Sequence, residues 1–149
     1  MTVNILINGN KFEAREGQTI LEAARENRIR IPTLCYHKDL SPTGNCRICV
    51  VQVKNARFLQ AACVTKVTEG MEIETENKRV VTSRKLSMQL MLANHPQDCL
   101  TCEVSGECEL QDLAYEYQVH VPTWGTKGTR YLSDRDHNPV VRVDKNKCS

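Results

Sequence analysis

Eight cysteines in 149 residues constrain this chain more than any other feature of its sequence. Seven of them fall into two separate groups, and the eighth is the penultimate residue. The N-terminus has no basic start followed by an apolar run, so we expect a cytoplasmic protein. Thiols stay reduced in that compartment, where grouped cysteines are more typical of metal ligands than of disulfides.

The first group has the spacing Cys-x10-Cys-x2-Cys-x13-Cys and comprises Cys35, Cys46, Cys49 and Cys63. A structural zinc site usually pairs two short knuckles, and only Cys46 and Cys49 form one here. An iron–sulfur cluster needs backbone N–H groups aimed at its anionic sulfurs, and Gly44 allows a close backbone approach. The spacing therefore favours an iron–sulfur cluster over zinc or disulfides, and its first gap differs from that of plant-type ferredoxins.

The second group has the spacing His-x3-Cys-x2-Cys-x5-Cys and comprises His95, Cys99, Cys102 and Cys108. It lies between two segments of helical pattern, so both helix ends can converge on one metal centre. The N-terminal turn at Cys108 offers N–H groups that stabilise a thiolate. From spacing alone, a zinc site with three cysteines and one histidine remains open, as does a helix-end role for His95.

The segments around the first group predict an α+β fold of the β-grasp type, a ferredoxin-like sheet wrapped on one helix. Val3–Ile7 and Lys11–Arg15 read as a hairpin closed by a type I′ turn at Asn8–Gly9. Thr19 and Glu22 form a capping box that opens a helix, with four apolar side chains available for the core. The helix covers Ile20–Asn27, and further strands are expected at Val50–Val53, Phe58–Ala62 and Met71–Thr75.

A second, small helical domain is expected after the sheet. Ser83–Ala93 has a helical pattern with Leu86 and Leu90 on one face, and a second helix places Leu110, Leu113, Ala114 and Tyr117 at helical spacing. The predicted domains are residues 1–78, 79–120 and an irregular docking tail, 121–149, ending in a strand-like Val140–Val143. Cys148 cannot complete a cluster within this chain, which is either naturally short or a fragment, and we expect it to be a free surface thiol.

The first-group segments Ile31–His37 and Gly44–Cys49 resemble the N-terminal [2Fe–2S] domain of one family. That family includes the large iron–sulfur subunit of respiratory complex I and the electron-input arm of NAD-linked hydrogenases and formate dehydrogenases. Glu107–Ala114 is similar to a stretch of its next module, where a [4Fe–4S] cluster has one histidine ligand. The resemblance implies a [2Fe–2S] cluster on the first four cysteines and a [4Fe–4S] cluster on His95, Cys99, Cys102 and Cys108. His37 is then either a surface residue or a neighbour of the ligands, since four cysteines complete the first set.

The resemblance also implies a function as an electron relay. The chain has no G-x-G-x-x-G fingerprint and no nucleophile–base set, so we expect no catalytic centre of its own. It would pass electrons between a flavin and NAD(P)H-binding partner and a hydrogenase or formate dehydrogenase partner, including electron-bifurcating assemblies. The alternatives are a free ferredoxin-like shuttle, which should be strongly acidic, and a non-redox zinc scaffold. A formal charge of +2 without a dense basic tract argues against nucleic-acid binding, and no segment is long enough to span a membrane.

Overall fold

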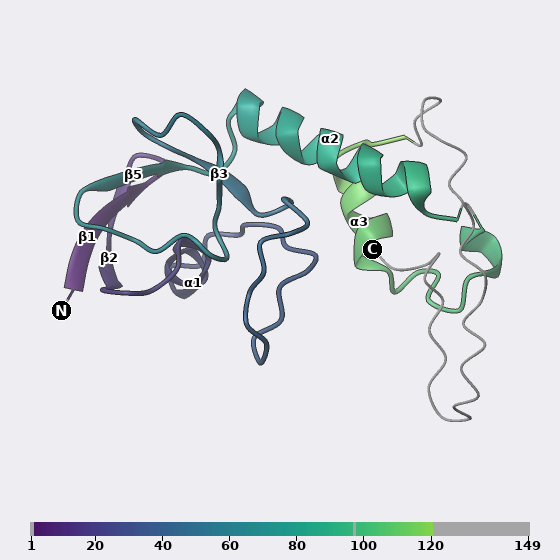
Figure 1. Cartoon of the computed structure of the whole chain (residues 1–149), viewed down its shortest axis with the longest axis horizontal. Coiled ribbons are helices and arrows are strands. Elements are labelled where there is room, and N and C mark those ends of the chain that lie inside the picture. The colour runs from purple at the N-terminus through teal and green to yellow at the C-terminus, as the bar shows by residue number, and fades with distance from the viewer. Residues whose placement is uncertain (1, 97, 121–149) are drawn as a thin grey trace. The chain divides into compact units, whose positions relative to one another are not determined.

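The computed structural model describes residues 2–96 and 98–120. The chain divides into two units, Met1–Ser87 and Met88–Ser149, and the division falls inside a helix (Figure 1). The domain boundaries expected from the sequence therefore stay a prediction. The predicted strand at Val140–Val143, the tail 121–149 and Cys148 lie outside the described residues.

The first unit contains a five-stranded sheet in the order β2-β1-β5-β3-β4. Strands β1 and β5 are parallel, and the other three pairings are antiparallel. The sheet contributes Ile5, Ile7 and Ile73 to one buried core together with helix α1. The α+β, ferredoxin-like fold is thereby confirmed. The strands are β1 (Thr2–Ile7), β2 (Asn10–Arg15), β3 (Val50–Val53), β4 (Gln60–Ala61) and β5 (Met71–Glu74).

The hairpin between β1 and β2 forms as its sequence predicts. Asn8 and Gly9 both have positive φ, 51° and 81°, which is the backbone of a type I′ turn. The register pairs Ile7 with Asn10 directly across that turn. This pairing places Ile5 and Ile7 in the core, because a shift of one residue would turn both outward.

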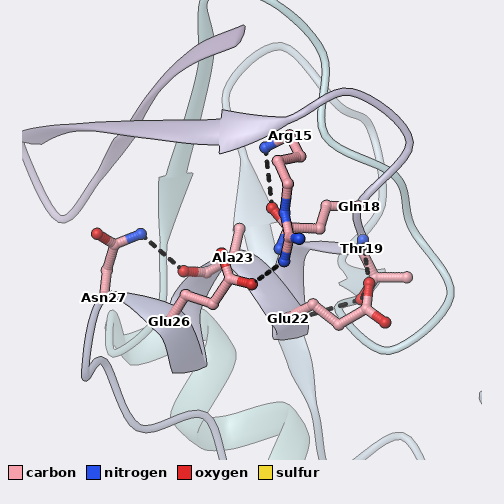
Figure 2. Close-up of polar contacts among 7 residues, drawn as sticks. All are labelled: Arg15, Gln18, Thr19, Glu22, Ala23, Glu26 and Asn27. Carbon is pink, nitrogen blue, oxygen red and sulfur yellow. Dashed lines mark hydrogen bonds and ion pairs between the residues drawn. The ribbon is translucent and has the colours of Figure 1, made fainter. Parts of the chain in front are cut away.

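Helix α1 (Ile20–Glu26) begins at the predicted capping box, which Figure 2 shows. The Glu22 backbone N–H donates to Thr19 Oγ1 over 3.2 Å, and the Thr19 N–H donates to Glu22 Oε2 over 2.7 Å. At the other end of the helix, Glu26 pairs with Arg15 of β2. The side chains predicted for the core are all fully buried, namely Ile20, Leu21, Ala23 and Ala24.

Strand β4 is shorter than the Phe58–Ala62 strand expected from the sequence. A turn with Asn55 at φ 68° follows β3, and only the last part of the return segment pairs with the sheet. Phe58 is exposed, and the Arg57 guanidinium lies over its ring, with Cζ 5.1 Å from the ring centroid. The pattern overestimated the strand because an aromatic residue beside an arginine also suits an exposed stacked pair.

Helix α2 (Lys78–Asn94) is longer than predicted and buries a different face. Leu86 and Leu90 are about half exposed, at 50% and 51%. The buried line is instead Val80, Arg84 and Met88, spaced four residues apart. Apolar residues occur on more than one side of this helix, and the line that is buried contains an arginine.

The second unit contains a short 3-10 helix, η1 (Cys99–Thr101), and helix α3 (Glu109–Glu116). Leu110, Leu113 and Tyr117 are buried, so the predicted apolar face of α3 is confirmed. Within the described residues, none of the helices has the length and apolar character required to cross a membrane.

Candidate iron–sulfur centres

The turn that carries Cys63 is bonded to the start of helix α1. The first N–H groups of a helix have no partner within the helix. Here the Ile20 N–H donates to the Thr65 carbonyl over 2.8 Å, and the Leu21 N–H donates to the Ala62 carbonyl over 2.9 Å. The first turn of α1 therefore fixes the chain on both sides of Cys63.

Cys49 and Cys63 are brought together in the core of the first unit. Their sulfur atoms lie 3.4 Å apart, and the two residues are 2% and 1% exposed. A hydrogen bond from the Ala62 N–H to the Cys49 carbonyl, 3.1 Å long, holds the two backbones side by side. Burial, followed by the Cys49 thiol beside it, raises the pKa of Cys63 to about 12. Two buried thiols at this separation favour a cation that would compensate their deprotonation.

The loop that carries Cys46 bends sharply on both sides of it. Gly44 has φ 67°, and a Cβ atom there would approach Val64 Cγ2 to 3.2 Å, so the position suits glycine. Arg47 has φ 57°, which is uncommon for a residue with a side chain. Such left-handed positions let successive N–H groups face one side of a loop, as in anion-binding nests.

The N–H groups of this loop are directed at the cysteine sulfurs. Burial acts to raise the pKa of Cys35, but hydrogen bonds from Cys46, Thr43 and Asn45 outweigh it and place the pKa below its usual value. For Cys46, burial raises the pKa, and a hydrogen bond from the Ile48 N–H acts against it. Hydrogen bonds of this kind stabilise anionic sulfur, which is what an iron–sulfur cluster presents to its protein.

The charges of these four thiols interact, and their arrangement is compatible with a [2Fe–2S] core. Charge interactions with the Cys49, Cys35 and Cys46 thiols all contribute to the raised pKa of Cys63, so the four sulfurs act on one another. Among residues 2–96 and 98–120, however, no three His, Cys, Asp or Glu side chains form a group that could hold a single metal ion. A [2Fe–2S] core spreads four cysteines over two irons, so it does not require three donors around one ion.

The second candidate group lies on the segment between α2 and α3. His95 directly follows α2, and its N–H donates to the Met91 carbonyl over 3.0 Å. Cys99 opens η1 and is exposed, whereas Cys102 and Cys108 are partly buried. Cys108 is the N-cap of α3, one position before the first helical turn in which the sequence had suggested it lies.

Backbone turns give this second segment its shape. The Cys102 N–H donates to the Cys99 carbonyl over 3.3 Å, and the Ser105 N–H donates to the Cys102 carbonyl over 3.1 Å. Gly106 has φ 86°, and its N–H donates to Gln111 Oε1 over 3.2 Å. The four candidate ligands of the second group thus lie in one short segment. Among the described residues, no sulfur–sulfur contact like that between Cys49 and Cys63 joins them.

Some residues around the first group were not apparent from sequence spacing. Thr43 donates a hydrogen bond to Cys35 from its side chain, and a hydroxyl residue near a ligand loop is the signal that would have suggested it. Asn45 donates from its backbone N–H, which residue type does not reveal. Arg84 lies against the residue that follows Cys49, and no sequence signal indicated it. His37 is exposed, and its Nδ1 accepts the Asp39 N–H over 3.3 Å, in agreement with a surface residue.

Two family models match this chain in the order that the cysteine groups suggest. Residues 1–78 match the 2Fe-2S iron-sulfur cluster binding domain. Residues 84–122 match the NADH-ubiquinone oxidoreductase-G iron-sulfur binding region. Together with the ferredoxin-like fold, these matches define the class as an iron–sulfur protein with a [2Fe–2S] and a [4Fe–4S] cluster.

Individual relatives agree with both matches. The chain is 35% identical over 147 residues to an NADH-quinone oxidoreductase subunit of Rhizobium meliloti (strain 1021), with 98% of this chain and 17% of the relative covered. It is 40% identical over 149 residues to an NADP-reducing hydrogenase subunit of Solidesulfovibrio fructosivorans, with 96% and 26% covered. The chain therefore spans about a sixth to a quarter of the length of these curated relatives.

A solved structure is similar as well. The crystal structure of an NAD+-reducing [NiFe]-hydrogenase in the H2-reduced state aligns with a TM-score of 0.82 and 29% identity. The alignment covers 91% of this chain and 57% of that chain. The chain belongs to the family whose iron–sulfur region is shared by subunits of NADH-quinone oxidoreductase and of NADP-reducing hydrogenase.

Proposed function

We propose that the four thiols of the first unit are the ligands of the [2Fe–2S] cluster. The observation that carries this assignment is the buried contact between Cys49 and Cys63, 3.4 Å between sulfurs, with Cys35 and Cys46 also acting electrostatically on Cys63. The N–H groups around Cys46 would stabilise the bound anionic sulfur. Gly44 keeps the loop close enough for them to do so.

We propose His95, Cys99, Cys102 and Cys108 as the ligands of the [4Fe–4S] cluster. All four lie in the segment from the end of α2 to the N-cap of α3, inside the stretch that matches the second family model. The first-turn N–H groups of α3 follow Cys108 directly, and the positive end of the helix dipole stabilises its thiolate. A thiolate at a helix N-terminus is a favourable ligand for a cluster of this kind.

The function that this arrangement supports best is one-electron relay. Bound clusters supply reversible uptake of single electrons, and the chain's own residues hold them, donate hydrogen bonds to sulfur and exclude water on the Cys49–Cys63 side. The relatives named above are subunits of NADH-quinone oxidoreductase and NADP-reducing hydrogenase. By analogy, this chain would pass electrons between a flavin and NAD(P)H-binding partner and a catalytic partner of the hydrogenase or formate dehydrogenase type, bifurcating assemblies included.

The relay function is tested with the purified, cluster-loaded chain and with a complex of its cognate partner subunits prepared without this chain. The chain alone should be reduced by dithionite and reoxidised by artificial acceptors, with no NADH oxidation and no hydrogen uptake. Added to the incomplete complex, it should restore electron flow from NADH to the catalytic subunit. Turnover of NADH or hydrogen by the isolated chain would contradict the relay function, and a colourless zinc protein would contradict both cluster assignments.

A further inference from the structure

Arg84 is the largest fully buried side chain of the described residues. Its guanidinium is 0% exposed, with Nη1 lying 2.6 Å from Glu76 Oε1 and Nη2 donating to the Val50 carbonyl over 2.9 Å. A buried charge is costly to a fold unless it is paired and hydrogen-bonded, and arginine is rarely buried to this degree. This side chain therefore calls for an explanation beyond the packing of helix α2.

The carbonyl that Arg84 contacts belongs to the residue directly after a proposed cluster ligand. Cys49 precedes Val50, the first residue of β3, and the Cys49 carbonyl accepts the Ala62 N–H over 3.1 Å. The peptide chain around Cys49 is therefore held from two directions, by Ala62 on one side and by Arg84 on the other. Movement of the Val50 carbonyl would move the Cys49 sulfur as well, since only a few bonds separate them.

The pairing of Arg84 with Glu76 leaves the two charges in different surroundings. The Glu76 side chain is 54% exposed, so water screens much of its negative charge. The Arg84 charge lies in the interior, where the effective dielectric constant is lower and its field reaches further. The carboxylate therefore offsets the guanidinium only in part.

We propose that Arg84 is a positioning residue for the [2Fe–2S] centre, holding the Cys49–Val50 backbone and favouring the reduced state through its buried positive charge. The inference rests on the proposed ligand role of Cys49. Reduction by dithionite delivers one electron to the centre and adds one negative charge there. A permanent guanidinium charge nearby stabilises that added charge, and Glu76 weakens the effect.

Two substitutions separate this role from simple anchoring of α2. Arg84→Met removes the charge and keeps an unbranched stem, whereas Glu76→Gln removes the offsetting charge at almost constant shape. Both lose the ion pair, so an anchoring role alone predicts lower thermal stability for both and no systematic change in potential. A charge role predicts potentials that move in opposite directions, downward for Arg84→Met and upward for Glu76→Gln.

The experiment is a dithionite titration of the cluster-loaded full chain, followed by electron paramagnetic resonance, with thermal unfolding measured in parallel. For Arg84→Met we expect a shift of the one-electron equilibrium on the order of tenfold toward the oxidised state, or about 59 mV. Glu76→Gln should shift it by a smaller factor toward the reduced state. Arg84→Lys should keep most of the wild-type potential, because it keeps the charge.

Arg79→Met is the matched control. Arg79 lies on the same helix and also donates to a backbone carbonyl, that of Arg57 over 3.0 Å, but it is exposed. Its replacement should leave the potential unchanged. Equal potentials for wild type and Glu76→Gln would overturn the proposal. Shifts of the same sign for Glu76→Gln and Arg84→Met would also overturn it. If Arg84→Met does not fold, the potential of Glu76→Gln alone decides the question. A wild-type chain without the [2Fe–2S] signal would overturn the ligand assignment itself.

Discussion

The two cysteine-bearing units differ in what holds their proposed ligands in place. In the first, Cys35 is exposed, but Cys49 and Cys63 belong to the hydrophobic core that also contains Ile5 and Ile73. In the second, Cys99 is exposed, and the segment that carries it is shaped by turns between backbone groups. We infer that the first site is formed largely by the folded protein, whereas the second needs its cluster to fix its geometry. Small modules with thin cores commonly depend on metal in this way.

Removal of iron should have the largest effect and should affect the two units differently. After reduction and anaerobic chelation, amide hydrogens in residues 95–119 should lose most of their protection from exchange, because cluster binding is coupled to folding there. Amides of β1, β5 and α1 should keep most of theirs. Hydrogen exchange read by mass spectrometry measures both regions in one sample. If amides around η1 and α3 kept their protection from exchange in the metal-free chain, the inference that the second unit depends on its cluster would be wrong.

Single ligand substitutions should have the next largest effect. Cys49→Ser should abolish the [2Fe–2S] resonance signal and destabilise the first unit by about 1–3 kcal/mol, because a buried hydroxyl replaces a ligand in the core. Cys99→Ser, at an exposed position, should abolish the [4Fe–4S] signal and leave the first unit's unfolding unchanged. The comparison is made by resonance spectroscopy and thermal unfolding of both variants. Loss of both signals in either variant would indicate that the sites are not independent.

A core substitution tests whether the first unit is held by its own packing. Ile73→Ala should lower the free energy of unfolding of the metal-free chain by about 2–5 kcal/mol, since it empties space in the buried sheet face. Leu86→Ala, on the exposed face of α2, is the control and should change it by no more than about 0.5 kcal/mol. Urea unfolding followed by circular dichroism gives both values. A large loss of unfolding free energy for Leu86→Ala would mean that the Leu86 face of α2 is buried in the protein.

The smallest effect is expected from His95→Cys, which should preserve both folds and both clusters. Replacing a neutral imidazole by a thiolate adds a negative charge to the ligands of the [4Fe–4S] centre, so that centre should become harder to reduce. The [2Fe–2S] potential should stay where it is and serves as the internal control. Redox titration of both signals in the same sample measures the difference, and an unmoved [4Fe–4S] potential would exclude His95 as its ligand.

Features determined by short-range chemistry could be predicted from the sequence. The turn at Asn8–Gly9, the capping box of Thr19 and Glu22, and the buried face of α3 each depend on residues a few positions apart. These predictions succeeded because the physical cause lies within the segment itself. An iron–sulfur centre could also be expected from the spacing of the first cysteine group, whereas the ligand role of its four cysteines stays a prediction.

Features determined by distant partners could not be predicted. The burial of Arg84 depends on Val50, which lies 34 positions away along the chain, and on Glu76, which precedes helix α2. Leu86 and Leu90 share one face of the predicted helical pattern, yet the structure leaves both about half exposed. Hydrophobic period alone does not specify which side of a helix meets the sheet when apolar residues occur on several sides.

The most direct test of the two-cluster account is a metal analysis and redox titration of anaerobically purified protein. One [2Fe–2S] and one [4Fe–4S] cluster require about six irons and about six acid-labile sulfides per chain. Stepwise reduction with dithionite should bleach the visible absorption and reveal two resonance signals that appear at different potentials. About one equivalent of zinc with little iron, or a single signal that accounts for all the iron, would contradict the account.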